Sequence, residues 1–241
     1  MKKAYLNWSS GKDSALALFK LQEQKGFAVE KLVTTINTDV DRVSMHGLRN
    51  ELLFQQAQSI GLPLQVIALN GAVSMEEYNS EMQKTTELLL QEGYNYSVFG
   101  DIFLEDLRNY REEQLKKAGL QGVYPLWKKD TSELIQEFLQ LNFKAIVVCV
   151  NANVLDKSFC GRIIDQAFLD DLPEGVDPCG ENGEFHSFVF DGPVFKNPIA
   201  FEIGEKVEKS YPQNKNKEDN CFSDDDRSWD SRFWYCDLLP K

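Results

Sequence analysis

The stretch KAYLNWSSGKDSALALFKLQEQK, residues 3–25, decides the fold of this chain. Lys3–Asn7 is short and apolar and predicts a strand, whereas Asp13–Lys25 carries apolar side chains at helical spacing and predicts a helix. The polar segment Trp8–Ser14 joins the two through Gly11. A strand that turns through a glycine into a helix is typical of the first unit of an α/β fold.

The rest of the first half repeats this alternation. The sequence predicts strands at Val29–Asn37, Leu64–Leu69, Tyr96–Gly100 and Gly122–Pro125, and helices at Leu48–Ile60, Met75–Gln91 and Leu104–Lys117. We therefore expect an α/β domain with a parallel sheet covered by helices on both faces. In such a sheet, ligands bind beyond the carboxyl ends of the strands.

The second half has a different pattern. The sequence predicts helices at Thr131–Leu141 and Gly161–Leu169, and strands at Lys144–Val150, Phe185–Asp191, Phe201–Lys209 and Arg232–Leu238. Strands without intervening helices favour a small mixed or antiparallel sheet. We expect two domains, residues 1–125 and a smaller α+β domain at 126–241, the second with a long exposed loop at 212–230.

The composition of the chain argues against several classes of binding partner. The formal net charge of −12 argues against nucleic acid, because an acidic surface repels a phosphate backbone. No apolar run reaches the roughly 18 residues of a membrane helix, and polar residues interrupt the region of a signal peptide's core. The five cysteines form no C-x-x-C pair, which favours reduced thiols over disulfides or zinc. We expect a cytoplasmic protein without a membrane partner; a homo-oligomer stays open.

The segment between the first strand and the first helix is suited to an anion. Gly11 permits a tight turn and a close approach of the backbone, and the helix directs its N-terminal N–H groups at the same place. Further donors come from Ser9, Ser10, Lys12 and Ser14. A pyrophosphate group is the natural ligand, and Asp13 is a helix cap or a magnesium ligand. A simple helix N-cap is the alternative.

Two further strand ends converge on this side of the sheet. Gly100 and Asp101 follow the fourth strand, and Asp101 is a second candidate magnesium ligand beside Asp13. The loop after Asn37 carries Arg42 and His46, which are placed to close over a nucleotide or an acyl substrate. A solvated loop that caps the next helix explains these two side chains equally well.

The segment EGVDPCGENGEFHSFVFDGP, residues 174–193, is rich in glycine and carboxylates and leads into a strand. Glu184 and His186 stand two residues apart and so face the same side of that strand. A carboxylate beside an imidazole can bind an ammonium group, move a proton or ligate a metal. The alternative is an acidic turn before an edge strand, with His186 in an ordinary hydrogen bond.

Together these motifs resemble a known family. Residues 9–14, SSGKDS, are similar to the S-G-G-x-D-S phosphate loop (PP-loop) of N-type ATP pyrophosphatases, with Ser10 in place of the first glycine. Residues 180–187, GENGEFHS, resemble the G-E-x-G-E-[FY]-[HE]-[ST] segment of the diphthine–ammonia ligase family. Phe99–Ile102 and Pro125–Trp127 resemble it as well. The resemblance runs from the first strand to about Pro198.

The resemblance implies an adenine nucleotide alpha hydrolase-like, Rossmann-like domain. It also implies a particular reaction. Family members use ATP and Mg²⁺ to convert a carboxylate into an acyl-adenylate with release of pyrophosphate, and free ammonia then displaces AMP. The carboxylate is a small molecule or is carried by a protein. The implied catalytic residues are Lys12, Asp13, Asp101, Glu184 and His186. The implied nucleotide contacts are Ser9–Ser14, Asn37 and Gly100, and the implied substrate contacts are Arg42, His46, Glu181, Glu184 and His186.

Two other functions stay open at this point. A PP-loop enzyme that modifies tRNA would need a basic face and often a paired cysteine motif, neither of which the sequence shows. A nucleotide sensor would share the fold and bind ATP or AMP without turnover, because a fold alone does not fix chemistry. Products of ATP turnover distinguish both from a ligase.

Overall fold

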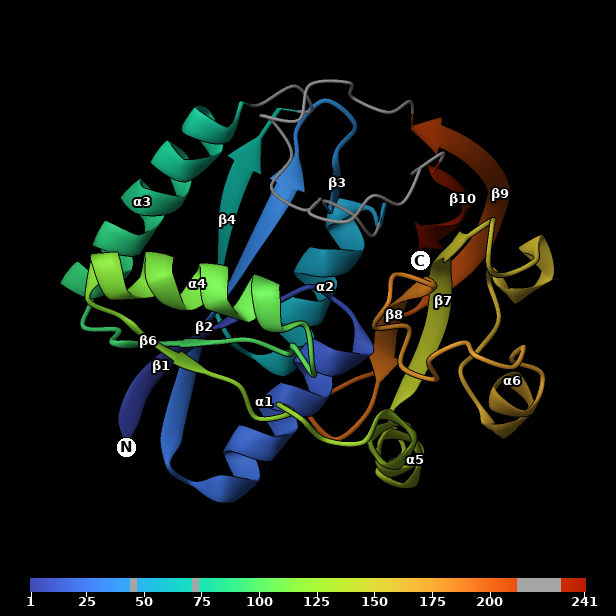
Figure 1. The fold of residues 1–241 in the computed structure, drawn as a ribbon, viewed down its shortest axis with the longest axis horizontal. Helices are drawn as coiled ribbons and strands as arrows, with labels where there is room; N and C mark the ends of the chain where they lie inside the picture. Colours follow the sequence, from blue (N-terminus) through green and yellow to red (C-terminus); the bar gives the residue numbers. More distant parts are fainter. Residues whose placement is uncertain (44–46, 71–73, 212–230) are drawn as a thin grey trace.

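The structure is a computed structural model that describes residues 1–43, 47–70, 74–211 and 231–241. Predictions that fall on His46 and on loop 212–230 lie outside the described residues. The chain builds two sheets, and the first is formed before residue 124 (Figure 1). The mixed α/β class expected from the alternation of strand and helix is confirmed.

The first sheet contains six strands, five of them parallel. Its strands are β1 Lys2–Asn7, β2 Phe27–Asn37, β3 Arg42–Val43, β4 Leu64–Leu69, β5 Tyr96–Val98 and β6 Gln121–Val123. The connecting helices are α1 Lys12–Gln24, α2 Asn50–Ile60, α3 Met75–Gln91 and α4 Glu105–Ala118. The sequence did not predict β3, a two-residue strand antiparallel to the end of β2.

Strand β1 is the point at which the order of the strands reverses. It pairs with β2 on one side and β5 on the other, with β4 beyond β2 and β6 beyond β5. The carboxyl ends of β1 and β5 therefore lie side by side. This position is where open α/β sheets bind ligands, as the sequence predicts.

Alternate residues of the sheet enter different cores. Ala4 and Leu6 of β1 face the core that contains α1 and α2, whereas Tyr5 faces the core that contains side chains of α3 and α4. This period of two is the ordinary alternation of a strand with both faces covered. Figure 1 shows α3 and α4 on one side of the sheet, with α1 and α2 between the two sheets.

The second sheet is entirely antiparallel, with strand order β8-β7-β10-β9. Its strands are β7 Lys144–Asn151, β8 Phe185–Asp191, β9 Phe201–Tyr211 and β10 Ser231–Pro240. The helical elements before and beside it are α5 Thr131–Gln140, η1 Lys157–Phe159 and α6 Gln166–Asp170. Apolar residues of β7, β8 and β10 join the core of α1 and α2, so the sheets share one interior.

The helix predicted at Gly161–Leu169 is shorter in the structure. Its first half is extended beside β7, where Val147 N–H donates to Arg162 C=O at 2.9 Å and Ile164 N–H to Ala145 C=O at 2.8 Å. The helix α6 begins only after Asp165, whose side chain caps Phe168 N–H. Backbone bonds to a neighbouring strand therefore override the local helical pattern.

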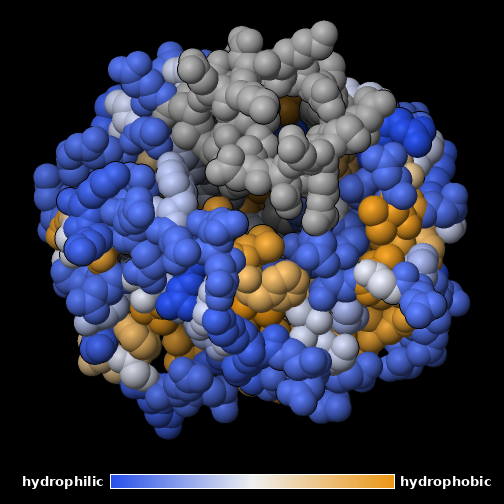
Figure 2. Space-filling model, in the orientation of Figure 1, coloured by the Kyte–Doolittle hydropathy of each residue, from blue (hydrophilic) through white to orange (hydrophobic). Residues whose placement is uncertain are grey.

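The visible surface is mainly hydrophilic, as the charge of −12 leads one to expect (Figure 2). Scattered apolar side chains such as Leu104 and Ile163 interrupt it. Among the described residues, no helix combines the length and the apolar character required to cross a membrane. The four described cysteines, Cys149, Cys160, Cys179 and Cys236, are buried free thiols.

Candidate active site

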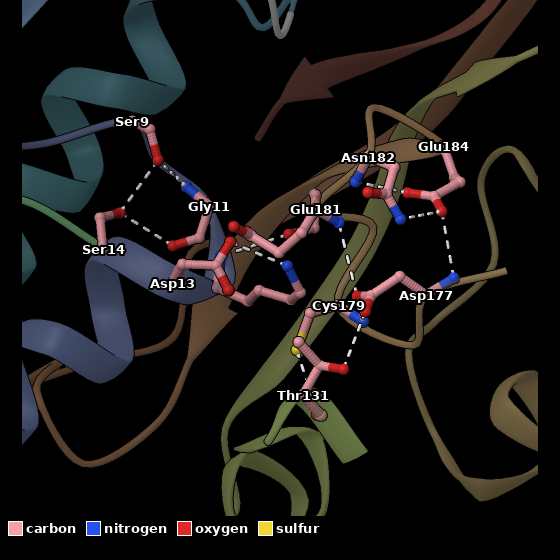
Figure 3. Close-up of polar contacts among 12 residues, drawn as sticks. Ser9, Gly11, Asp13, Ser14, Thr131, Asp177, Cys179, Glu181, Asn182 and Glu184 are labelled. Carbon is pink, nitrogen blue, oxygen red and sulfur yellow. Dashed lines mark hydrogen bonds and ion pairs between the residues drawn. The ribbon is translucent and has the colours of Figure 1, made fainter. Parts of the chain in front are cut away.

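The phosphate loop forms a compact polar turn at the head of α1. Ser10 adopts φ 70°, in the left-handed region, and Gly11 is the N-cap of α1 without a side-chain capping bond. Gly11 N–H donates to Ser9 Oγ at 3.3 Å, the Ser9 and Ser14 hydroxyls lie 3.2 Å apart, and Ser14 Oγ donates to Gly11 C=O at 2.9 Å (Figure 3). The loop is thus a cluster of small polar groups at the N-terminus of α1, whose N-cap is made without a side-chain bond.

Gly100 packs directly on this turn. A Cβ at Gly100 would lie 2.9 Å from Asp13 C and 2.9 Å from Ser14 N, both backbone atoms that cannot swing aside. Only glycine lets the chain just beyond β5 come this close to α1. The structure therefore brings Gly100 and Asp101 beside Asp13, as the sequence predicts from their places at strand ends.

Lys12 is buried with only 4% exposure and lies against its neighbour. Its Nζ is 2.8 Å from Asp13 Oδ2 and 5.7 Å from the centre of the Phe185 ring. Burial acts to lower the pKa of Lys12, but the carboxylates of Asp13 and Glu181 outweigh burial and raise that pKa above its ordinary value. The ammonium group is therefore held charged inside the site.

Two acidic side chains, Asp13 and Glu181, lie near this ammonium, and Asp101 lies near Asp13. Burial raises the pKa of Asp101 and Asp13 adds to the rise, while an ion pair with Arg111 opposes it. Burial, with the charges of Asp13 and Asp101, raises the pKa of Glu181 to about 8 against the opposing charge of Lys12. Figure 3 shows Asp13 on α1 and Glu181 on the loop before β8 reaching toward one another. We name Asp13, Asp101 and Glu181 the acidic group.

Glu184, in contrast, bonds within its own loop. Its carboxylate accepts hydrogen bonds from Asp177 N–H at 3.1 Å and Asn182 N–H at 2.9 Å, and from the Asn182 side chain at 3.0 Å. Asp177 in turn accepts from Cys179 N–H at 2.7 Å and from the Thr131 hydroxyl at 2.8 Å (Figure 3). Because Glu184 is only 4% exposed and its oxygens are occupied, its contacts shape the loop that presents Glu181.

His186 lies on β8, half-buried, opposite Cys149 of β7. Burial, together with the nearby charge of Lys12, lowers the pKa of His186 to about 4. The imidazole is thus neutral at physiological pH and close enough to the site to respond to Lys12.

The middle of β8 forms the other wall of the phosphate loop. Lys12 N–H donates to Ser187 Oγ at 3.2 Å, and Val189 N–H donates to Ser10 C=O at 3.0 Å. Gln56 of α2 donates to Ser10 C=O at 3.1 Å and Val189 C=O at 2.6 Å, and accepts from Trp8 Nε1 at 2.9 Å. Sequence reasoning missed Gln56, although it is a polar residue on the apolar face of its helix.

Two predicted ligand contacts lie apart from this cluster. Arg42 donates to Gly47 C=O at 2.9 Å and to Asp237 Oδ1 at 2.5 Å, so it joins β3 to β10. Asn37 caps its own turn by accepting from Asp39 N–H at 2.9 Å. The contacts of both residues are structural, and their roles toward a ligand stay predictions.

The described side chains form no closed metal cage. In the part of the chain that the structure describes, no set of three or more histidine, cysteine, aspartate or glutamate side chains is arranged to hold an ion. Asp13 and Asp101 each face a cation, Lys12 and Arg111. Magnesium in nucleotide sites commonly takes one or two carboxylates, with waters and phosphate oxygens as the other ligands. The pair Asp13 and Asp101 fits that donor set.

Comparison with known proteins matches both halves of the chain. Residues 1–122 match the family described as diphthamide synthase N-terminal domain, and residues 130–217 match diphthamide synthase C-terminal domain. Diphthine–ammonia ligases are similar: that of Bos taurus is 35% identical over 44% of this chain, and that of Mus musculus 31% identical over 63%. The matches cover 42% and 62% of those proteins, so the chain spans less than two thirds of their length.

One solved structure is also similar. It is a U34-tRNA thiolase NcsA from Methanococcus maripaludis with its [4Fe-4S] cluster, 17% identical, with a TM-score of 0.38. The match covers 58% of this chain and 56% of that one. A similarity of this size carries no argument about function.

Proposed function

The chain belongs to the diphthamide synthase family, and from this premise we propose that it is an ATP-dependent ligase that converts a carboxylate into an amide with ammonia. One observation carries the proposal. The phosphate loop contacts Gly100 on one side and Ser187 on the other, so three separated sequence motifs meet at one place. The acidic group lies beside the loop, next to the place where the phosphates of a nucleotide would bind.

The reaction divides into two steps. An oxygen of the substrate carboxylate attacks the α-phosphorus of ATP, and the bond to the β-phosphate breaks to release pyrophosphate. The nitrogen of ammonia then attacks the acyl carbon, loses a proton and displaces AMP. Donors of the phosphate loop and the positive end of α1 stabilise charge on the departing pyrophosphate.

The roles of individual residues follow from their positions. Gly11 N–H and the Ser9 and Ser14 hydroxyls hold phosphate oxygens, and buried Lys12 adds a fixed positive charge. A magnesium ion held by Asp13 and Asp101 would neutralise phosphate charge. Glu181 and His186 are the side chains that we assign to the ammonia and acyl side of the site, because Glu184 is occupied in its own loop.

The resemblance to diphthine–ammonia ligases suggests a diphthine side chain as the carboxylate. We retain the predicted division at residue 125, a cytoplasmic location and the absence of a nucleic-acid substrate as parts of this proposal. The acidic charge of the chain supports the last of these.

Product analysis tests the proposal. The protein is incubated with ATP, magnesium, isotope-labelled ammonium and either a diphthine-bearing protein or small carboxylates. We expect AMP, pyrophosphate and a labelled amide. ADP and phosphate would contradict an adenylating ligase, and ATP binding without products would favour a sensor. Asp13→Ala and Ser14→Ala should lower the rate at least about 100-fold, as loss of transition-state donors does.

A further inference from the structure

We infer that Gln56 is a positioning residue for nucleotide binding, which holds the phosphate loop in its donor conformation through the Ser10 carbonyl. The inference rests on the proposed use of ATP and names a residue outside the predicted set. Gln56 lies on α2, in none of the four segments that resemble the family's motifs. It is completely buried and touches the loop and β8 at once.

The hydrogen bonds of Gln56 leave only one orientation of its amide. Trp8 Nε1 can only donate, so the Gln56 oxygen must face it. The carbonyls of Ser10 and Val189 can only accept, so the Gln56 nitrogen must face them. All three contacts are satisfied together, and no other residue type of this size supplies two donors and an acceptor in one plane.

The hydrogen bond from Gln56 to the Ser10 carbonyl acts on the nucleotide site through the Ser10–Gly11 peptide plane. Ser10 C=O accepts from both Gln56 and Val189 and is thereby fixed in direction. In a trans peptide the following N–H points the opposite way. The Gly11 N–H is therefore directed away from α2 and toward the Ser9 hydroxyl, at 3.3 Å. Gln56 fixes the orientation of this donor without touching a ligand.

The unusual backbone of the loop makes this restraint necessary. Ser10 adopts φ 70°, which a residue with a side chain rarely does unless its surroundings impose it. Without the Gln56 bond, the Ser10 carbonyl keeps only the Val189 N–H as a donor, and the strained Ser10–Gly11 peptide relaxes toward a lower-energy conformation. The Gly11 donor would then leave its position, and the affinity for ATP would fall.

Two variants and a matched control separate positioning from stability. Gln56→Glu keeps the shape but turns both donors into acceptors, and Gln56→Met keeps the volume without either donor. Ser59→Ala is the control, because Ser59 lies on the same helix, is also buried, and bonds to Asn197 instead of the loop. The melting temperature and the ATP dissociation constant of each full-length protein are measured by calorimetry.

We expect both Gln56 variants to weaken ATP binding at least about tenfold, and Ser59→Ala to change it less than about twofold. If Gln56→Met binds ATP as tightly as the parent protein does, the inference about Gln56 is wrong, while the proposed function still stands. A parent that binds no ATP would refute the proposed function, and the inference with it.

A second measurement needs no variant. In the parent protein, the Gly11 amide resonance should shift on addition of ATP, while that of Gly26 on the far end of α1 should not. An unchanged Gly11 amide, in a protein that binds ATP, would contradict the donor role on which the positioning depends.

Discussion

Two of the described contacts between the halves of the molecule use opposite chemistry. At the inner junction, Ser10, Gln56 and Val189 are fully buried, neutral and joined by hydrogen bonds. At the outer junction, Asp237 of β10 accepts from Arg42 at 2.5 Å and from Arg49 at 2.6 Å, with all three side chains partly exposed. Neutral buried bonds fix positions closely, whereas exposed ion pairs add little stability and respond to salt.

This contrast indicates a division of labour. The inner junction sets the geometry of the phosphate loop, and the outer junction holds the far ends of the sheets together. Changes at the inner junction should therefore affect stability and nucleotide binding together, and changes at the outer junction should affect stability slightly and binding hardly at all.

The largest effect is expected where the loop has no room to move. Gly100→Ala would press a Cβ against the backbone of Asp13 and Ser14, at a cost of about 2–3 kcal/mol in the free energy of unfolding. ATP binding should be lost as well, because the turn must shift. Urea unfolding and calorimetry measure the two effects. Gly26→Ala, where a Cβ meets nothing within 4 Å, is the matched control, and equal behaviour of both variants would disprove the close approach.

The second-largest expected effect is a pH dependence of stability that comes from His186 on β8. Burial lowers the pKa of His186 to about 4, whereas an unfolded histidine titrates near 6.5, so the unfolded state binds the proton more readily. The contribution of neutral His186 is complete above about pH 6.5 and is lost as the pH falls toward 4. Allowing for partial exposure, we expect a loss of order 2 kcal/mol. His186→Gln should flatten the pH profile of urea unfolding; an equal slope in both proteins would contradict the shift.

The outer junction should give a smaller and salt-dependent effect. Asp237→Asn should lower the free energy of unfolding by about 1 kcal/mol at low salt and less at high salt. Burial acts to raise the pKa of Asp237, but hydrogen bonds from Arg49 and Arg42 prevail and lower it to about 2. The stabilisation is therefore present above about pH 4 and lost as the pH falls toward 2.

Glu202→Gln supplies the comparison for that experiment, because Glu202 pairs with Lys241 at an exposed site. It should leave stability nearly unchanged. If Asp237→Asn weakened ATP binding as strongly as the Gln56 variants, the proposed division of labour between the junctions would be wrong.

The smallest effect should be a gain. Ser10 has a positive φ, and its buried Oγ has no hydrogen-bond partner among the described residues. Ser10→Gly removes both penalties and should stabilise the protein by about 0.5–1 kcal/mol, after allowance for the flexibility of glycine. Ser10→Ala, which removes only the hydroxyl, should gain less. Thermal unfolding of the two variants separates backbone strain from the buried hydroxyl.

Local patterns predicted most of the fold. The sheet of β1, β2, β4, β5 and β6 follows from apolar runs punctuated by glycine and proline, and the phosphate loop follows from its place between strand and helix. The helix predicted at Gly161–Leu169 was too long, because pairing of this segment with β7 is a tertiary contact that the local spacing does not contain.

The candidate site was only partly predictable for the same reason. Spacing along the chain places Asp13 beside Ser14, but the distance between Asp101 and Arg111, or between Gln56 and Ser10, depends on how whole elements pack. Glu184 and Glu181 look alike in sequence, and only their hydrogen bonds distinguish a carboxylate that shapes its loop from one that faces the site.

The contact between Val189 and Ser10 has a consequence for how the protein is made. The phosphate loop gains this partner only when the ribosome has added β8, the second of the four strands of the second sheet in chain order. Until then the phosphate loop of the nascent chain lacks its contact with Val189. Nucleotide binding should consequently begin only after β8 has been synthesised.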